Sequence, residues 1–386
     1  MAKNKRSISW DIVLSLFMLN VLIISAFSFI FEWNTTTTFL YGYVPLLIVI
    51  ASKVKTNKYL PYYLLAALFL VIFQFALTKK LATNYVMFWL IIPFCLMSSL
   101  NKCRDGRFNI LLIAGISIYL INCSVVIFEY INGVNLFYFQ MDYFDRFRAT
   151  GIYGHPLYGA LLHSSCMLFI LCSNLHKIFK IILYIIGFFT VFCYDARTAT
   201  VVTLASTFFL LYKWKYIRLK QLVPITIILI LIPFIIEYLE TSGLGGKLFT
   251  EEGTKVGKND ARLVAFRIFF DRSFDEIFFG VIDQVKIAER YGVKCIENGV
   301  FALILEFGLI PALLTLMILT KNLYAFMRVR LPKLESRLFL GSFLVIAVTS
   351  QALATAYIWI DYIMLLFLFC NNPQKNEYYI LSQKKH

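Results

Sequence analysis

Long apolar runs recur along almost the whole of this sequence, and they limit the folds that the chain can adopt. Many of these runs are roughly 17 to 25 residues long, the length that an α-helix needs to cross a bilayer. Of the 386 residues, 60% are apolar and only 15% are charged. An outer-membrane barrel would show alternating segments of about ten residues instead. We therefore predict an all-α, polytopic membrane protein with a single integral membrane domain over residues 1–386.

The apolar runs divide into twelve predicted spans. The first run, Trp10–Phe31, is too long for the core of a signal peptide and lacks a small-residue cleavage site, so we expect it to remain as a span. The spans are predicted at 10–31, 37–52, 59–77, 84–99, 109–128, 157–172, 178–193, 198–212, 221–238, 299–319, 338–353 and 356–370.

The distribution of Lys and Arg orients these spans. The net charge of +15 would suggest nucleic acid in a soluble protein, but cytoplasmic loops of membrane proteins carry such an excess. With the N-terminus inside, the inner segments hold 23 of the 37 Lys and Arg residues. We therefore expect both termini to be cytoplasmic, no nucleic-acid partner, and two long loops on the outer side, at 129–156 and 239–298.

The second of these loops should contain short helices. The stretch Asp260–Glu276 has a helical pattern, with Asp260 as a plausible cap and Leu263, Phe266 and Phe270 on one face. Such a helix is suited to lie in the membrane interface as a lid.

The polar residues predicted on the outer side are mostly cationic. The sequence has no GxxxxGK[ST], no HExxH and no Cys/His cluster, so it implies neither nucleotide hydrolysis nor a metal or other cofactor. A guanidinium group keeps its charge when desolvated and binds phosphate oxygens in a forked geometry. Because three separate outer segments supply arginines, we predict a site for a diphosphate headgroup, made by Arg148, Arg197, Arg262 and Arg267.

Three of these arginines, and two candidates for a catalytic base, His155 and Glu297, also have a purely structural interpretation. Arg148 could anchor at the interface, Arg197 could pair with Asp195 in a tight turn, and a lone Arg262 could be solvated. His155 before Pro156 could simply mark the start of a span. The negative charge of Glu297 could simply stabilise the N-terminus of the helix that follows it. As a catalytic base, Glu297 is the first candidate and His155 the second.

Four pieces of the sequence, covering about 145–312, resemble the O-antigen polymerase and O-antigen ligase superfamily. They are RATGIYGHPLYGALL, ARTATVVTL, ARLVAFRIFFDRSFDEIFFG and ENGVFALILEFGLIPALL. The polymerase branch repeats an arginine followed after ten residues by glycine, and Arg148 with Gly159 fits this spacing. Neither Arg262 nor Arg267 fits it, because Ser273 and Phe278 stand where the glycine would be.

The resemblance implies a function as well as a fold. It implies a glycosyltransferase-C-like membrane protein that joins undecaprenyl-diphosphate-linked oligosaccharides by inverting, metal-independent transfer, alongside a flippase and a chain-length regulator. The ligase branch has histidine where this chain has Glu297, so the resemblance favours the polymerase. A ligase that moves glycan to lipid A-core remains an alternative, and a lipid-linked sugar flippase or secondary transporter is an alternative of another class.

Overall fold

The structure is a computed structural model that describes residues 13, 16–21, 24, 37, 39–51, 65, 68–69, 72, 75–76, 91–100, 108–136, 147–214, 261–280, 284–293 and 296–370. These residues form helices and turns, with no strand among them. The all-α prediction is therefore confirmed for the described part of the chain. The predicted span 221–238 and most of the predicted span 59–77 lie outside it.

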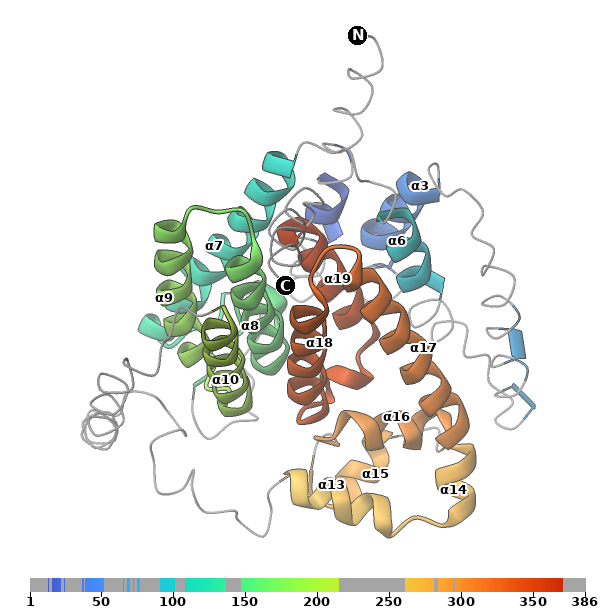
Figure 1. The fold of residues 1–386 in the computed structure, drawn as a ribbon. Coiled ribbons are helices and arrows are strands. Elements are labelled where there is room, and N and C mark those ends of the chain that lie inside the picture. The colour runs from blue at the N-terminus through green and yellow to red at the C-terminus, as the bar shows by residue number, and fades with distance from the viewer. Residues whose placement is uncertain are drawn as a thin grey trace.

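The elements follow one another along the chain as a series of helices (Figure 1). The α-helices are α3 (Val44–Ala51), α6 (Ile92–Leu100), α7 (Phe108–Asn132), α8 (Pro156–Cys172), α9 (Lys177–Cys193), α10 (Arg197–Lys213), α13 (Ala261–Phe270), α14 (Phe274–Phe279), α15 (Gln284–Arg290), α16 (Gly299–Phe307), α17 (Leu309–Arg328), α18 (Lys333–Val348) and α19 (Ala356–Cys370). A π-helical turn η1 (Phe39–Tyr43) and the 3-10 turns η3 (Gly151–Tyr153) and η6 (Gln351–Ala354) complete the series.

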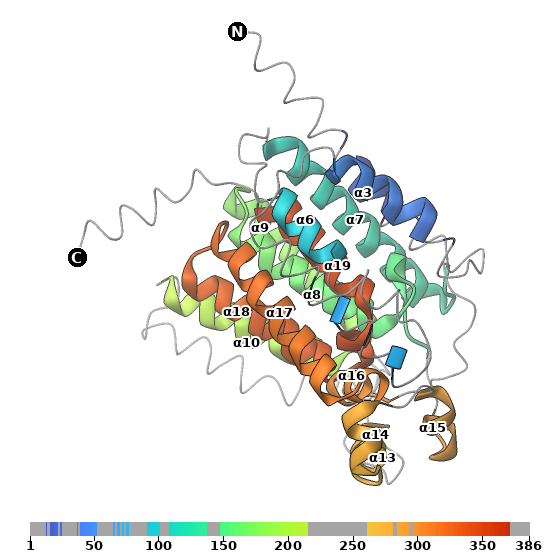
Figure 2. The same cartoon turned by 90° about the vertical axis from the view of Figure 1, so that its right-hand side faces the viewer.

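Helices α8 and α19 form the buried centre of a bundle. Helix α8 packs against α9, α10 and α18, while α19 packs against α6, α7 and α8 (Figure 2). Every residue of α19 from Ile358 to Cys370 is buried. The ring of Tyr362 on α19 lies against Phe169 of α8 and Phe343 of α18, so aromatic packing joins the three helices.

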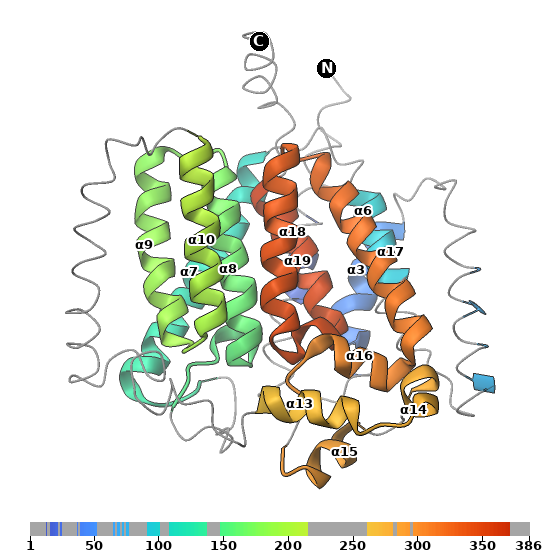
Figure 3. The same cartoon turned by 60° about the horizontal axis from the view of Figure 1, so that its bottom comes forward.

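The two ends of the bundle differ in the helices that begin and finish there and in the hydrogen bonds between them. At one end, Trp214 donates to Glu335 at 3.0 Å and Arg330 donates to the carbonyl of Leu100 at 2.9 Å. At the other end, α7 and α9 finish and α8, α10, α16 and α19 begin (Figure 3). We name this second end the site end, because His155, Arg197 and Glu297 lie at the starts of α8, α10 and α16.

Two described helices, Ile110–Asn132 and Leu309–Arg328, are long and apolar enough to cross a membrane. Pro156–Cys172 and Tyr357–Cys370 are apolar but shorter. The predicted boundaries of spans 157–172, 178–193, 198–212 and 356–370 agree with α8, α9, α10 and α19 to within one residue. The number of spans remains a prediction.

Three sequence-based predictions of element boundaries were wrong. The predicted span 299–319 is two helices, α16 and α17, separated at Gly308, whose φ is 86°. The single helix predicted over Asp260–Glu276 is broken between α13 and α14, because Ser273 and Glu276 form a capping box that starts a new helix. The loop predicted to begin at Glu129 begins later, because α7 continues to Asn132.

Candidate functional site

The segment that carries Arg148 is held by a buried carboxyl group near the end of α7. Glu129 is fully buried and accepts backbone hydrogen bonds from Leu136 at 2.8 Å, Thr150 at 2.7 Å and Gly151 at 2.8 Å. The hydroxyl of Thr150 donates to the same carboxyl group. Turns leave backbone N–H groups without helical partners, and here one side chain satisfies three of them. Glu129 therefore fixes the position of the backbone immediately after Arg148.

Arg148 itself contacts the turn between α9 and α10. Its Nε lies 3.5 Å from Oδ2 of Asp195, and both side chains are largely buried. The neighbouring Ala149 donates its N–H to the carbonyl of Cys193 at 3.4 Å. Asp195 has a φ of 51°, a conformation that Asp tolerates better than most residues with side chains. These contacts join the two predicted arginine segments at one place.

Tyr194 and Gly151 complete this junction. The hydroxyl of Tyr194 donates to Oδ1 of Asn122 at 3.0 Å, and the N–H of Ile152 donates to the same oxygen at 3.3 Å. A Cβ added to Gly151 would meet both the Tyr194 hydroxyl and Asn122 Oδ1 at 2.6 Å, so only glycine fits there. Gly151 also has a φ of 60°, which favours glycine for a second reason.

Arg197 begins α10, two residues after Asp195, and its side chain is half-buried. The structure therefore places the Arg148 segment and the start of α10, which carries Arg197, at the same junction. The sequence analysis predicted these two arginines for one anion site. The plain alternative, a turn in which Asp195 serves Arg197, is incomplete, because Asp195 forms an ion pair with Arg148. The carboxyl group also reduces the net positive charge that this junction presents to an anion.

His155 caps the N-terminus of α8. Its Nδ1 accepts a hydrogen bond from the N–H of Leu157 at 3.2 Å, and its ring stacks on Tyr158 with centroids 4.1 Å apart. Burial and the positive charge of Arg148 lower the pKa of His155 from 6.5 to about 4. Because Nδ1 is an acceptor, the neutral ring carries its proton on Nε2. His155 is therefore suited to donate a hydrogen bond and poorly suited to act as a base.

A chain of contacts leads from His155 to the start of α16. Tyr158 accepts from the hydroxyl of Thr355 at 3.0 Å, and Thr355 directly follows η6. Gly299, the first residue of α16, lies so close to Leu353 of η6 that an added Cβ would be 2.4 Å from the Leu353 Cβ. Asn298 caps α16, accepting from the N–H groups of Val300 and Phe301.

Glu297 is half-buried and immediately precedes this cap, so it belongs to the same end of the bundle as His155. An acidic side chain at this position also interacts favourably with the positive end of the α16 dipole. Glu297 therefore has both a structural and a functional interpretation.

The two predicted arginines of α13 differ from Arg148 and Arg197. The side chain of Arg262 lies outside the described residues. Arg267 is 77% exposed and pairs at 3.9 Å with Asp271, which directly follows α13, an arrangement that contributes little at a surface. The structure thus brings the segments of Arg148 and Arg197 together and leaves Arg267 on the surface of α13.

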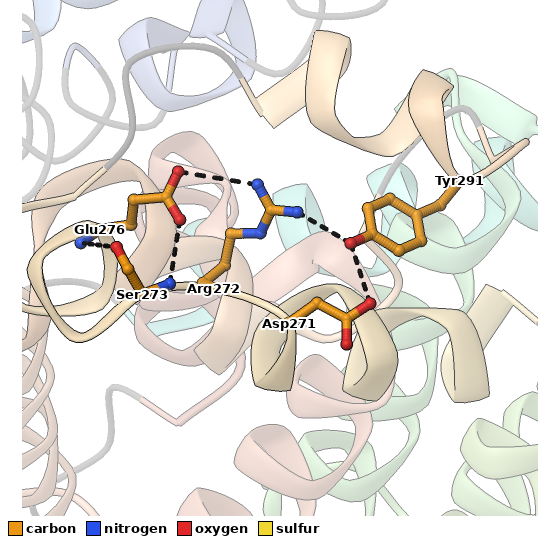
Figure 4. Close-up of polar contacts among 5 residues, drawn as sticks. All are labelled: Asp271, Arg272, Ser273, Glu276 and Tyr291. Atoms are coloured by element: carbon orange, nitrogen blue, oxygen red, sulfur yellow. Dashed lines mark hydrogen bonds and ion pairs between the residues drawn. The ribbon is translucent and has the colours of Figure 1, made fainter.

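Arg272 is an arginine that the sequence analysis did not select. Its side chain is 14% exposed and donates to the hydroxyl of Tyr291 at 2.8 Å, while Tyr291 donates to Asp271 at 3.0 Å (Figure 4). Arg272 also lies 3.7 Å from Glu276, which belongs to the capping box of α14. This polar cluster fastens α13, α14 and the end of α15 to one another.

Within the described part of the chain, no three His, Cys, Asp or Glu side chains are grouped as metal ligands would be. No protein-family model matches this sequence, and a search of curated proteins gives no significant match.

Proposed function

We propose that this protein is a glycan polymerase of the bacterial inner membrane, acting at the periplasmic face on undecaprenyl-diphosphate-linked oligosaccharide repeat units. The observation that carries this proposal is the junction at the site end. Arg148 and Arg197, 49 positions apart in the printed sequence, lie on two segments that are joined by the Arg148–Asp195 ion pair and the Ala149–Cys193 hydrogen bond. An anion that binds there would meet two guanidinium groups and the N-termini of α8 and α10.

The proposed reaction needs an activated donor and a base. A hydroxyl oxygen of the incoming repeat unit bonds to the anomeric carbon of the growing chain, and the bond from that carbon to the diphosphate breaks. The electron pair leaves on the diphosphate, where Arg148, Arg197 and Arg262 stabilise the developing charge, assisted by Arg267. Glu297 takes the proton of the hydroxyl group, since His155 has its Nδ1 lone pair engaged by Leu157.

The proposed arrangement has twelve spans with both termini in the cytoplasm. Support comes from the basic residues of the short connections at the end opposite the site, namely Lys177, Lys213, Arg328, Arg330 and Lys333. The site end then faces the periplasm, and the protein works alongside a flippase and a chain-length regulator.

The proposal is tested by the length of polysaccharide made in a deletion strain. Arg197→Ala and Arg262→Ala should reduce a long ladder to single capped repeats, while Arg290→Ala on the exposed side of α15 should leave the ladder intact. Arg148→Ala is tested together with Asp195→Asn, so that no buried carboxyl group loses its partner. Unchanged ladders at normal protein level in the Arg197 and Arg262 variants would contradict the site.

The same experiment separates polymerase from ligase. A ligase transfers finished glycan to lipid A-core, so its loss removes every capped species, including the single repeat. A polymerase defect leaves the single capped repeat in place.

A transport function is the second candidate, because α19 contains a buried acid. Asp361 is 2% exposed, and its Oδ1 has no hydrogen-bond partner among the described residues. Ionisable residues inside membrane proteins often mark ion or substrate pathways. If the protein is a proton-coupled transporter, Asp361→Asn should abolish the polysaccharide ladder, while Arg197→Ala should leave a measurable ladder. The polymerase proposal expects the reverse order of severity.

A further inference from the structure

Helices α13 and α14 expose a group of large apolar side chains at the site end. On α13 these are Leu263, Phe266 and Phe270, at helical spacing, with Phe270 74% exposed. Phe274 at the start of α14 is 73% exposed. The opposite face of α13, formed by Val264, Ala265 and Ile268, is buried against α15 and α16. We name these four exposed side chains, Leu263, Phe266, Phe270 and Phe274, the apolar face.

This face is held in a fixed position on the bundle. Phe269 of α13 stacks on Phe301 of α16 with centroids 4.3 Å apart. The polar cluster around Arg272 joins the ends of α13 and α15 to the start of α14 through hydrogen bonds and an ion pair (Figure 4). The exposed phenylalanines are therefore not loose side chains of a surface loop.

Two glycines attach α14 to the break between α16 and α17. A Cβ on Gly280 would lie 2.6 Å from the N of Gly308, and a Cβ on Gly308 would lie 2.5 Å from the carbonyl oxygen of Phe278. Both glycines have positive φ, at 85° and 86°. Such close backbone contact leaves no room for a side chain, so α14 is fixed to the first turn of α17.

Helix α17 continues the apolar surface. It is one of the two described helices with the length and composition to cross a membrane, and it exposes Ile310, Leu313 and Met317. A bilayer around α17 would reach its first turn at the level where α14 is attached. Arg267, on the exposed side of α13, is placed to meet anionic headgroups. Phenylalanine rings beside a basic side chain are typical of helices that lie in a membrane interface.

We propose that the apolar face docks on the outer leaflet of the membrane that contains α17, with Phe270 and Phe274 among the acyl chains. The proposal rests on α17 crossing the membrane, which is part of the proposed function, and not on the proposed reaction. Docking would fix α13, which carries Arg262 and Arg267, at the height of a lipid-linked diphosphate.

Photo-crosslinking in a defined bilayer tests this proposal. The full-length protein, with p-benzoylphenylalanine at position 270, 274, 289 or 313, is reconstituted into nanodiscs of phosphatidylethanolamine and phosphatidylglycerol. Illumination is followed by mass spectrometry of the adducts. Positions 270 and 274 should form phospholipid adducts with yields near that of position 313 on α17. Position 289, exposed on the polar surface of α15, should give a yield several-fold lower.

Other outcomes overturn the proposal in distinguishable ways. Adducts at 313 without adducts at 270 and 274 would overturn the docking and leave the membrane-spanning α17 intact. Absence of lipid adducts at all of 270, 274 and 313 would overturn both. Adducts of positions 270 and 274 with a second copy of the chain would assign the apolar face to a protein interface instead. If a polyprenyl lipid is added to the nanodiscs and forms the adducts in place of phospholipid, the apolar face would be assigned to that lipid.

Discussion

The ring of Tyr194 lies directly against the backbone of Gly159, so that a Cβ added to Gly159 would be 2.5 Å from Cε1 of Tyr194. The spacing of Arg148 and Gly159 therefore has a structural meaning in this chain. Glycine on the first turns of α8 lets the turn after α9 approach, and that turn carries Asp195, the partner of Arg148. The arginine and the glycine act on the same junction from two sides.

We expect Gly159→Ala to destabilise the junction. The added methyl group needs a shift of Tyr194, which is fully buried and hydrogen-bonded to Asn122, and overpacking of this kind typically costs about 1–3 kcal/mol. The apparent unfolding temperature of the purified protein in detergent should fall. Gly341→Ala on α18 is the matched control, because its added Cβ would have no atom within 4 Å apart from its chain neighbours and the backbone of its own helix. A fall of equal size in both variants would show that the Tyr194 contact is unimportant.

We expect Arg148 and Asp195 to be energetically coupled. Removal of one partner of a buried ion pair leaves an uncompensated charge and commonly costs about 3–5 kcal/mol. Arg148→Met and Asp195→Asn should each lower stability, and the double variant should lose clearly less than the sum of the two. Denaturant unfolding of the four proteins gives the coupling energy. Additive losses would mean that the 3.5 Å contact contributes no stability.

The sequence predicted the features that depend on neighbouring residues better than those that depend on contacts between residues far apart in the sequence. The boundaries of α8, α9, α10 and α19 follow from apolar runs and from local signals such as Pro156 at the start of α8. The breaks at Gly308 and Ser273 were missed. The apolar run continues across Gly308, and the break there depends on the close approach of Gly280, which is 28 positions away in the printed sequence.

The candidate site shows the same division. Arg148, Arg197 and His155 stand out in the sequence because they are polar residues beside apolar runs. Glu129 was assigned to a loop, although its role comes from backbone groups of residues 136, 150 and 151 that only the folded chain brings to it. Asp361 carries a signal that could have been used, an acid inside the last apolar run. The pairing of Arg148 with Asp195 needed the folded chain.

We expect Glu129→Gln to loosen the backbone that this carboxyl group holds, at Leu136 or at Thr150 and Gly151. One of the two carboxyl oxygens becomes an NH₂ group, which cannot accept a hydrogen bond, so either the N–H of Leu136 or the N–H groups of Thr150 and Gly151 lose their acceptor. A buried donor without an acceptor costs about 1–3 kcal/mol. Hydrogen exchange should therefore accelerate by roughly tenfold or more either in a peptide covering 147–155 or in one that includes Leu136. Glu289→Gln on the exposed side of α15 is the control, and equal exchange in the two variants would contradict the role of Glu129.

We expect His155 to make the stability of the protein depend on pH in the acid range. Its pKa is lowered by burial and by Arg148 from 6.5 to about 4, so the unfolded chain binds a proton at His155 between these values and the folded chain does not. Proton binding by the unfolded state alone means that the free energy of unfolding falls as the pH drops from 6.5 towards 4. Above pH 6.5 the contribution of His155 is constant.

Substitution by asparagine isolates this effect. Asn caps a helix N-terminus well and does not titrate, so His155→Asn should keep the hydrogen bond to the N–H of Leu157 while removing the proton-linked term. The apparent unfolding temperatures of the two proteins should lie close together at pH 8, and the wild type should lose more between pH 6.5 and 4. Carboxyl groups titrate in the same pH range in both proteins. The measurement is therefore the difference between the wild-type and His155→Asn curves of unfolding temperature against pH. Parallel curves would show that His155 titrates alike in the folded and unfolded chains, and a base role for His155 would then deserve a new test.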